Sequence, residues 1–523
     1  MKKSIFSIIF SLVVIVCMGQ GFSNPILPGF YPDPSICRVG DDYYIVNSSF
    51  QFFPAVPIHH SKDLINWESI GYVLDRPSQV KLEKIGFWNG IYAPSIRYHS
   101  GVFYMTTTNT SDKGNFYVYT ENPASEWSEP IWVDQGGIDP DIFFDEDGKT
   151  YFVSAMGGIH LCQIDIKTGK RLSETQKIWD GTGARHTEAP HIYKKDGYYY
   201  LLVAEGGTEY GHKATIARSR SLFGPYESNP GNPILTHINQ NGAFSPIQGI
   251  GHADFIQAHD GSWWTVFLGF RPQSGIHHLL GRETFLAPVK WEENTWPVIN
   301  GDGTVSLSMD CATLPQTKAP EKSIKVDFKE SKLGNEWNYL CNPNLDNYSL
   351  TEREGYLRLK ASTITLANID SPTFIGRRQQ HINFRATTIL DYSNLKENSE
   401  AGITTYMASN YRYDLSIKRA NNKDILTLSY YLGSLRHIEK EVELSDTKVY
   451  LRVEGNNDIY SYYYSTNDEE YRNLGNIDTR FLSTETAGGF TGIYLGLFAQ
   501  SKNADNSYVD FDWFEYVPFS ENK

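Results

Sequence analysis

Asp33-Pro34-Ser35-Ile36 is the first of five copies of one four-residue pattern in the first three hundred residues. The others are Ala93-Pro94-Ser95-Ile96, Asp139-Pro140-Asp141-Ile142, Ala189-Pro190-His191-Ile192 and His252-Ala253-Asp254-Phe255. Each copy is followed by a turn that contains glycine and then by a run of aromatic and β-branched residues, which together are typical of a β-hairpin. The copies begin 60, 46, 50 and 63 residues apart, which is the length of a four-stranded propeller blade.

Features beyond the hairpin repeat as well. Ser61-Lys62-Asp63-Leu64 with Trp67 matches Ser219-Arg220-Ser221-Leu222 with Tyr226, and each follows a short apolar strand. The sequence therefore predicts a five-bladed β-propeller over residues 22–305. The alternative is an ordinary β-sandwich in which Asp-Pro and Ala-Pro recur by coincidence, and five copies in one register disfavour it.

A different pattern begins after the repeat ends. Residues 306–322 have the character of a linker, and residues 323–523 carry alternating apolar and polar runs such as Val449-Tyr450-Leu451-Arg452-Val453-Glu454. Such runs over about 200 residues predict a second domain, a β-sandwich. A sandwich of this kind is either a sugar-binding, lectin-like module or a stabilising partner of the propeller.

The composition limits the fold and the partners. The chain has 523 residues, of which 40% are hydrophobic and 14% aromatic, and no long stretch has helical periodicity. This is an all-β composition that can bury two cores. The net charge is −14 without a basic cluster, which excludes nucleic acid and anionic membranes as expected partners and suits a neutral substrate.

The N-terminus predicts export. Lys2-Lys3 followed by the apolar run from Ile5 to Val16 is typical of a secretory signal over residues 1–21, and it is too short to span a membrane. Lipidation at Cys17 is the alternative. With no second hydrophobic segment, the mature protein is expected in the periplasm or outside the cell, either soluble or tethered by a lipid.

The remaining cysteines show no metal-type spacing. Cys37 and Cys162 lie within strand patterns and are expected to be buried free thiols, although a disulfide stays open in an oxidising compartment. The cysteines that remain besides Cys17 are Cys37, Cys162, Cys311 and Cys341.

The first position of the repeat identifies a candidate site. The inner strand of every blade lines the central channel, so equivalent positions converge there. Asp33, Asp139 and His252 occupy first positions, and Glu188 directly precedes the fourth copy. Packing does not call for three neighbouring acids, because like charges raise one another's pKa. A protonated and an ionised carboxyl group are the minimum equipment for hydrolysis of a glycosidic bond, and a third acid can set the pKa of the donor.

Aromatic residues between the blades are candidate platforms for a sugar ring. Phe50, Phe52 and Phe53 lie in one segment, and Trp88 lies in the segment before the second copy. Each of these residues is either a core residue or a platform, and we expect at least one to stack on sugar. Phe50, Phe53 and Trp88 are the candidate contacts with substrate.

Longer motifs resemble those of glycoside hydrolase family 43, in the branch of the β-xylosidases, over nearly the whole mature chain. They are residues 24–36, Gly137-Ile138-Asp139-Pro140, Thr187-Glu188-Ala189-Pro190-His191, Gly251-His252-Ala253-Asp254, Leu280-Gly281-Arg282-Glu283-Thr284 and, in the second domain, Gly376-Arg377-Arg378-Gln379-Gln380. The resemblance implies a concanavalin-like (jelly-roll) sandwich after the propeller and an enzyme that inverts the anomeric configuration.

Matched residue by residue, the resemblance places the general base at Asp33, the acid that sets the pKa at Asp139 and the general acid at Glu188. Arg282 matches an arginine that faces substrate, and Phe490 of the sandwich is expected in the wall of the pocket. No cofactor is required. His252 matches a histidine of the channel floor that meets a cation or water in some members, which leaves calcium open, although one histidine is no metal site by spacing.

The resemblance implies an exo-acting enzyme that releases terminal β-D-xylose, α-L-arabinofuranose or both from plant cell-wall oligosaccharides. Two alternatives are an arabinanase or galactan-cleaving relative and a non-catalytic carbohydrate-binding propeller. Retention of both Asp33 and Glu188 disfavours the second alternative. The preferred pentose, the linkage and the oligomeric state stay open.

Overall fold

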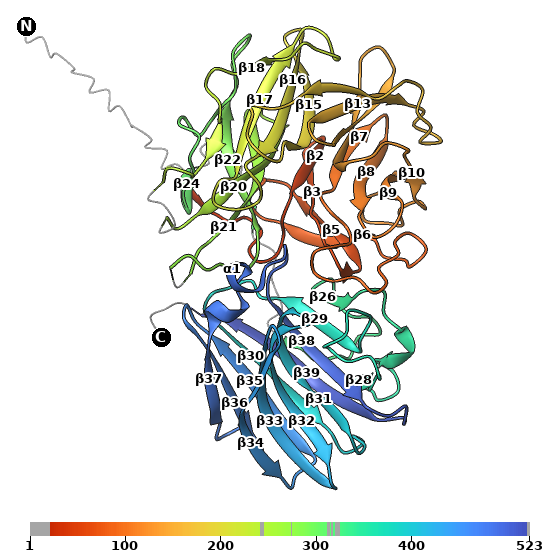
Figure 1. Ribbon diagram of the computed structural model, residues 1–523, viewed down its shortest axis with the longest axis vertical. Coiled ribbons are helices and arrows are strands. Elements are labelled where there is room, and N and C mark those ends of the chain that lie inside the picture. The colour runs from red at the N-terminus through yellow and green to blue at the C-terminus, as the bar shows by residue number, and fades with distance from the viewer. Residues whose placement is uncertain are drawn as a thin grey trace, which may run out of the picture.

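The computed structural model describes residues 21–240, 245–273, 275–310, 314, 317–318 and 325–519. Residues 1–20 of the predicted signal, Cys17, Cys311 and part of the predicted linker lie outside these ranges. Figure 1 shows the propeller, coloured red to green, above the sandwich, coloured cyan to blue. No helix within the described ranges has the length and apolar character needed to cross a membrane.

Five four-stranded antiparallel units form the propeller. Blade 1 consists of β2 (Ser35–Val39), β3 (Asp42–Val46), β5 (Ala55–Ser61) and β6 (Glu68–Leu74). Blade 2 consists of β7 (Ser95–His99), β8 (Val102–Asn109), β9 (Gly114–Thr120) and β10 (Ile131–Trp132). Blade 3 consists of β11 (Ile138–Phe144), β12 (Thr150–Ala155), β13 (Ile159–Ile164) and β14 (Gln176–Trp179).

Blade 4 consists of β15 (Glu188–Lys195), β16 (Tyr198–Glu205), β17 (Lys213–Ser219) and β18 (Glu227–Ser228), with β19 (Leu235–Thr236) also paired to β17. Blade 5 consists of β20 (Gln248–Gln257), β21 (Trp263–Phe270), β22 (Glu283–Lys290) and β23 (Val298–Ile299). Outside the blades, β1 (Gly21–Ser23) pairs with β24 (Ser308–Asp310). Each repeat begins at the inner strand of its blade, so the prediction of a five-bladed propeller is confirmed.

Two antiparallel sheets form the sandwich, each with eight strands in the described residues. One contains β25 (Lys325–Val326), β27 (Tyr348–Ser349), β28 (Leu357–Lys360), β30 (Phe384–Asp391), β35 (Lys448–Gly455), β36 (Ile459–Ser465), β37 (Arg472–Asp478) and β39 (Tyr508–Pro518). The other contains β26 (Trp337–Leu340), β29 (Phe374–Arg378), β31 (Ser399–Ala408), β32 (Tyr411–Ala420), β33 (Lys423–Leu432), β34 (Leu435–Leu444), β38 (Tyr494–Ser501) and β4 (Phe52–Phe53).

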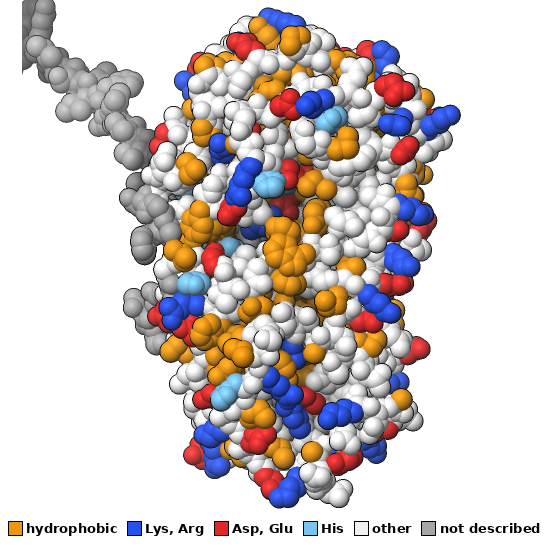
Figure 2. All heavy atoms as spheres, viewed as in Figure 1, with side chains coloured by type: hydrophobic (Ala, Val, Ile, Leu, Met, Phe, Trp, Pro, Cys, Tyr) orange, Lys and Arg blue, Asp and Glu red, His pale blue; other side chains and the backbone are white. Residues whose placement is uncertain are grey.

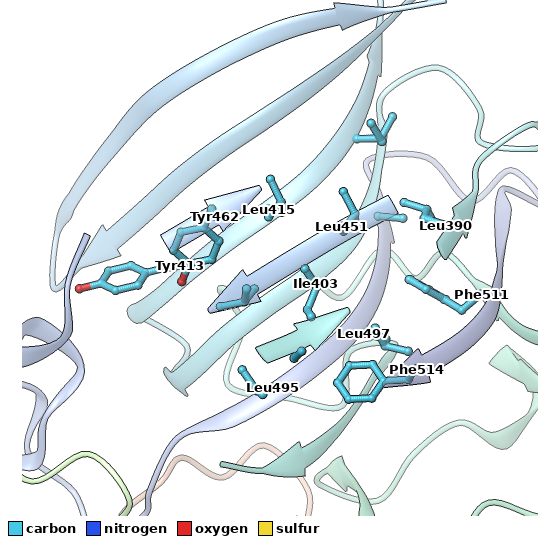
Figure 3. Close-up of a cluster of buried hydrophobic side chains, with 14 of the residues drawn as sticks. Leu390, Ile403, Tyr413, Leu415, Leu451, Tyr462, Leu495, Leu497, Phe511 and Phe514 are labelled. Atoms are coloured by element: carbon cyan, nitrogen blue, oxygen red, sulfur yellow. The ribbon is translucent and has the colours of Figure 1, made fainter. Parts of the chain in front are cut away.

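The space between the two sheets is filled by the alternate, inward-facing residues of their strands. Leu415 and Leu451 come from opposite sheets and are fully buried (Figure 3). Aromatic rings such as Phe511 and Phe514 complete this core. The prediction that the alternating runs of the sequence are strands with one buried face is therefore confirmed.

The two domains share one sheet. The short strand β4 belongs by sequence to the first blade, yet it pairs with β26 of the sandwich through Phe53 and Tyr339. From the sandwich side, a segment with two short helices, η3 (Thr479–Leu482) and α1 (Thr484–Ala487), contacts the propeller. Another short helix, η2 (Leu345–Asn347), precedes β27. The candidate catalytic residues lie at this junction, where β4 joins the sheet of the sandwich and the segment with η3 and α1 contacts the propeller.

The cysteines are simple to place. Cys37, Cys162 and Cys341 are buried and form no disulfide. The prediction of buried free thiols within the strand patterns is confirmed for Cys37 and Cys162.

Candidate active site

The inner strands turn side chains into the channel by a local distortion that recurs from blade to blade. Asp33, Asp139, Ala189 and His252 all have φ of 51° or 52°, in the left-handed region. Non-glycine residues pay on the order of 1 kcal/mol or more for this conformation. In blades 3, 4 and 5 the pairing register shifts at the same place, as between Glu188 and His191. A bulge there re-aims the side chain, which is a common device beside active sites.

The converging residues line a cavity of about 460 Å³. Its floor holds Asp33, Asp139 and His252, all buried, while the Glu188 side chain is 34% exposed. Figure 2 shows acidic and histidine side chains recessed in the upper half of the molecule, directly above a hydrophobic patch. The prediction that these four residues converge on one axis agrees with their positions.

Asp33 is held as a carboxylate. Arg282 Nη1 donates to Asp33 Oδ1 at 2.6 Å and Ser48 Oγ donates to Asp33 Oδ2 at 2.5 Å. Burial alone would raise the pKa of Asp33, but the Arg282 guanidinium and the hydrogen bond from Ser48 lower it below its usual value. Asp33 is therefore ionised at neutral pH and can accept a proton.

Asp139 and Glu188 have the opposite electrostatic environment. Burial, followed by repulsion from Glu188 and Asp33, raises the pKa of Asp139 well above its usual value. Burial also raises the pKa of Glu188, where His186 opposes the shift and Asp33 adds to it. Because the two carboxyl groups repel each other, the pair retains a proton at a pH at which an exposed carboxyl group has lost it.

The two buried histidines of the cavity, His252 and His212, are neutral. Burial lowers the pKa of His252 to about 3 and that of His212 to about 4. His212 Nδ1 lies 3.0 Å from the carbonyl oxygen of Gly249, and its ring lies where a side chain at residue 251 would be. His212 was not predicted from the sequence, because it lies outside the repeat. Its only signal was the glycine before His252, whose missing side chain leaves room for the His212 ring.

Arg282 connects the floor of the cavity to its wall. Besides Asp33, its Nη1 contacts Thr208 Oγ1 at 3.1 Å and its Nη2 contacts the carbonyl oxygen of Phe490 at 3.4 Å. The guanidinium also lies 5.6 Å from the ring centroids of both Phe50 and Phe490. One cation therefore orients the candidate base and the aromatic wall together.

The wall is aromatic and belongs to both domains. The Phe490 ring stacks on Phe50 at 5.6 Å and forms a T-shaped contact with Trp88 at 4.9 Å. Tyr92, which the sequence did not single out, lines the same wall. Phe50, Trp88 and Phe490 thus lie in the cavity wall, and their contact with substrate stays a prediction.

Phe53 is the exception among the predicted contacts. It is 5% exposed, packs in a cluster of buried residues beneath the wall and does not line the cavity. The expectation that it contacts substrate is wrong for this structure. The reason is the pairing of β4 with β26, which fixes Phe53 opposite Tyr339 and turns it into the core.

A second polar layer lies two residues further along the inner strands. Arg97 donates to Asp141 at 2.6 Å and to Asp254 at 2.8 Å, and His191 Nδ1 lies 2.9 Å from Asp141. The sequence carried a signal for this layer, because the third position of the repeat is polar in all five copies. Arg97 itself lies outside the repeat and was missed.

The groups around His252 do not suit calcium. Calcium takes about six to eight oxygen ligands. His252 Nδ1 lies 3.5 Å from Asp33 Oδ1, and that carboxylate is already bonded to Arg282 and Ser48. In the part of the chain that the structure describes, no three His, Cys, Asp or Glu residues are grouped to hold a metal ion.

A propeller whose channel holds one ionised carboxylate and a proton-retaining pair, beneath an aromatic wall, defines a glycoside hydrolase. The chain belongs to glycosyl hydrolases family 43, whose model matches residues 22–297. A second model, the β-xylosidase C-terminal concanavalin A-like domain, matches residues 325–517. Both the fold and the enzyme class implied by the sequence motifs are confirmed.

Relatives match over nearly the whole chain. A non-reducing end α-L-arabinofuranosidase of Bacteroides ovatus is 42% identical over 95% of this chain and 94% of its own. A β-xylosidase of Bacillus subtilis is 35% identical over 94% of this chain and 99% of its own. The solved structure of the xylan β-1,4-xylosidase from Bacillus halodurans superposes with a TM-score of 0.91 at 34% identity, covering 95% of this chain and 99% of that one.

Proposed function

We propose that the protein is an exo-acting, inverting hydrolase that releases terminal β-D-xylose, α-L-arabinofuranose or both from plant cell-wall oligosaccharides. The observation that carries the proposal is the opposite electrostatic setting of Asp33 and Glu188 in one cavity. The names of the Bacteroides ovatus and Bacillus subtilis relatives support these two sugars.

In the proposed mechanism, Asp33 removes a proton from water as that water attacks the anomeric carbon. Glu188 gives its proton to the departing glycosidic oxygen on the other face of the sugar ring. Inversion requires room for the water, which corresponds to a separation of about 6.5–9.5 Å between the two carboxyl groups. Repulsion between Asp139 and Glu188 lets the pair retain the proton that Glu188 donates, and Arg282 keeps Asp33 ionised.

The shape of the cavity supports exo action. The polar layer around Arg97 fills the channel further along the inner strands, and Phe490 and Gly488 of the sandwich close one side. A terminal sugar fits such a cavity, whereas an endo-acting arabinanase or galactanase needs a groove open at both ends. The neutral His252 and His212 leave Arg282 as the cation that faces the substrate.

Two measurements test the proposal. Release of nitrophenol from the β-D-xyloside and the α-L-arabinofuranoside, assayed side by side, shows which pentose the cavity accepts. Proton NMR of the first-formed sugar is expected to show the configuration opposite to that of the substrate. Product that initially keeps the configuration would exclude the roles given to Asp33 and Glu188.

We further propose that the enzyme is exported and works without a metal ion. The N-terminal segment supports export, with cleavage near residue 21 or lipidation at Cys17 as the two routes. The donor set around His252 supports metal independence. Activity that falls after treatment with a chelator and returns with calcium would contradict the second statement.

A further inference from the structure

A second cavity, of about 520 Å³, lies beside the candidate active site at the junction of the two domains. One side is the propeller segment from Lys84 to Asn89, and the other side is formed by residues 367–370 and 409–410 of the sandwich. Its volume is within the range of ordinary ligand sites. The proposed mechanism makes no use of it.

Trp88 separates the two cavities and lines both of them. Trp88 is 47% exposed, and its ring lies 5.7 Å from that of Phe87, which lines the second cavity. Phe87 in turn lies against Gly489 of the first cavity so closely that a side chain there would meet the ring at 2.0 Å. The partition is therefore no more than two aromatic rings thick, and a ligand that crosses Trp88 reaches both cavities.

The segment that carries Trp88 is fixed in place. The Tyr92 hydroxyl donates to the carbonyl oxygen of Trp88 at 2.7 Å, and Asn89 N donates to the carbonyl oxygen of Gly86 at 3.0 Å. Upstream, Leu82 N donates to Asn342 Oδ1 of the sandwich at 2.6 Å. The second cavity is thus preformed, which lowers the entropic cost of binding.

The lining suits a neutral sugar. Ile369, 56% exposed, and Phe87 offer apolar surface, while Asn89, Asp370 and Asn410 offer the planar polar groups that bond to hydroxyls. Lys84 and Asp370 contribute one charge of each sign, so their charges cancel. Mixed apolar walls with a few polar groups are typical of small-molecule sites.

The side of the catalytic cavity's mouth that faces away from Trp88 is less suited to a neutral sugar chain. There Arg185 and Glu209 form an ion pair, with His186 beside Glu188. All three of these side chains are more than half exposed, at 57%, 60% and 56%. Because the floor of the catalytic cavity is closed, the rest of a bound oligosaccharide must leave through the mouth, and Trp88 is the apolar way out.

We propose that the second cavity binds the leaving-group end of an oligosaccharide whose terminal sugar occupies the catalytic cavity. The ligand is a neutral chain of three or more sugars that crosses Trp88. This inference rests on the proposed function, since it assigns the second cavity to the same substrate.

Chain length provides the test. For the wild type, kcat/KM is expected to rise roughly fivefold or more from xylobiose to xylotetraose, which corresponds to about 1 kcal/mol or more of binding from the two further sugars together. Ala367→Trp fills the second cavity and Ile369→Ala removes apolar surface from it. Both variants should lower kcat/KM for xylotetraose towards that for xylobiose, with hydrolysis of the nitrophenyl glycosides unchanged.

The matched control is Ile438→Ala, which truncates an exposed isoleucine on β34, away from both cavities. It should keep the advantage of the longer substrate. A second readout is the binding of xylotetraose to Glu188→Ala, which should weaken severalfold when Ala367→Trp is added. This binding measurement also tests the second cavity if Ala367→Trp lowers kcat for a reason unrelated to that cavity.

The outcomes are distinct. For a wild type that hydrolyses the nitrophenyl β-D-xyloside, the absence of any gain from xylobiose to xylotetraose, or a gain that survives both Ala367→Trp and Ile369→Ala, overturns the inference. For a wild type that hydrolyses only the arabinofuranoside, the binding measurement judges the inference. Binding of xylotetraose that is indifferent to Ala367→Trp overturns it too. A wild type that releases nothing from either nitrophenyl glycoside instead contradicts the proposed function, while the binding measurement still judges the second cavity.

Discussion

The interior of the sandwich and the channel of the propeller are both shielded from water, but they bury different chemistry. Between the sandwich sheets lie aliphatic and aromatic side chains such as Leu415, Leu451 and Phe514. In the channel lie Asp33, Asp139 and, one layer further, Arg97 with two more carboxylates. Burial of a leucine side chain stabilises the fold, whereas burial of a charged group destabilises it. The charged channel is therefore maintained for chemistry rather than for stability.

The largest effects of mutation should therefore come from the channel. Asp33→Ala removes the base that activates water, which every substrate needs, so kcat/KM should fall by about 10²–10⁴-fold on all substrates. Glu188→Ala removes only the proton given to the leaving oxygen. Hydrolysis of xylobiose should nearly vanish, whereas dinitrophenyl glycosides, whose leaving group departs as an anion, should be spared.

Steady-state kinetics with both substrate types distinguish the two roles. The two variants serve as controls for each other, because each removes one carboxylate from the same cavity. If Glu188→Ala slows activated and unactivated substrates equally, Glu188 is not the general acid.

The boundary between the two regions should give the next largest effect. Expression of residues 22–320 alone removes Phe490 from the wall and uncovers β4, whose sheet neighbour β26 belongs to the sandwich. The fragment should be insoluble or poorly active. Phe490→Ala in the full chain isolates the loss of the wall and should reduce kcat/KM by roughly tenfold with the melting temperature little changed. A fragment with full activity on xylobiose would show that the sandwich is dispensable.

Within the channel, Asp139→Asn should change the pH profile. Glu188 must be protonated to act, so activity is lost as the pH rises through its pKa. The pKa at which the Asp139 and Glu188 pair loses its last proton is raised by their repulsion. An amide at residue 139 abolishes that repulsion, so the alkaline limb of kcat/KM should move down by about one pH unit. An alkaline limb that stays in place would show that Asp139 does not set this pKa.

The same contrast explains what could be predicted from the sequence. The repeat gave the blades and the convergence of Asp33, Asp139, Glu188 and His252, because equivalent positions of a propeller share one axis. Arg97 and His212 were missed because they reach the channel from outside the repeat. Phe53 was misplaced because its environment depends on a long-range pairing with Tyr339, which no local pattern reveals.

The smallest effect on catalysis is expected from the apolar region. Leu451 is fully buried between the sheets of the sandwich and does not line the cavity. Leu451→Ala should reduce the free energy of unfolding of the sandwich by about 2–5 kcal/mol, because it leaves a void that the sheets cannot close. Urea titration measures that loss, and kcat/KM at 25 °C should stay within about twofold of the wild type, since the cavity wall is fixed by contacts with the propeller such as that between Glu485 and His278 at 2.6 Å. A large fall in kcat/KM without unfolding would mean that the sandwich core transmits strain to Phe490, and the separation of stability from chemistry would then fail.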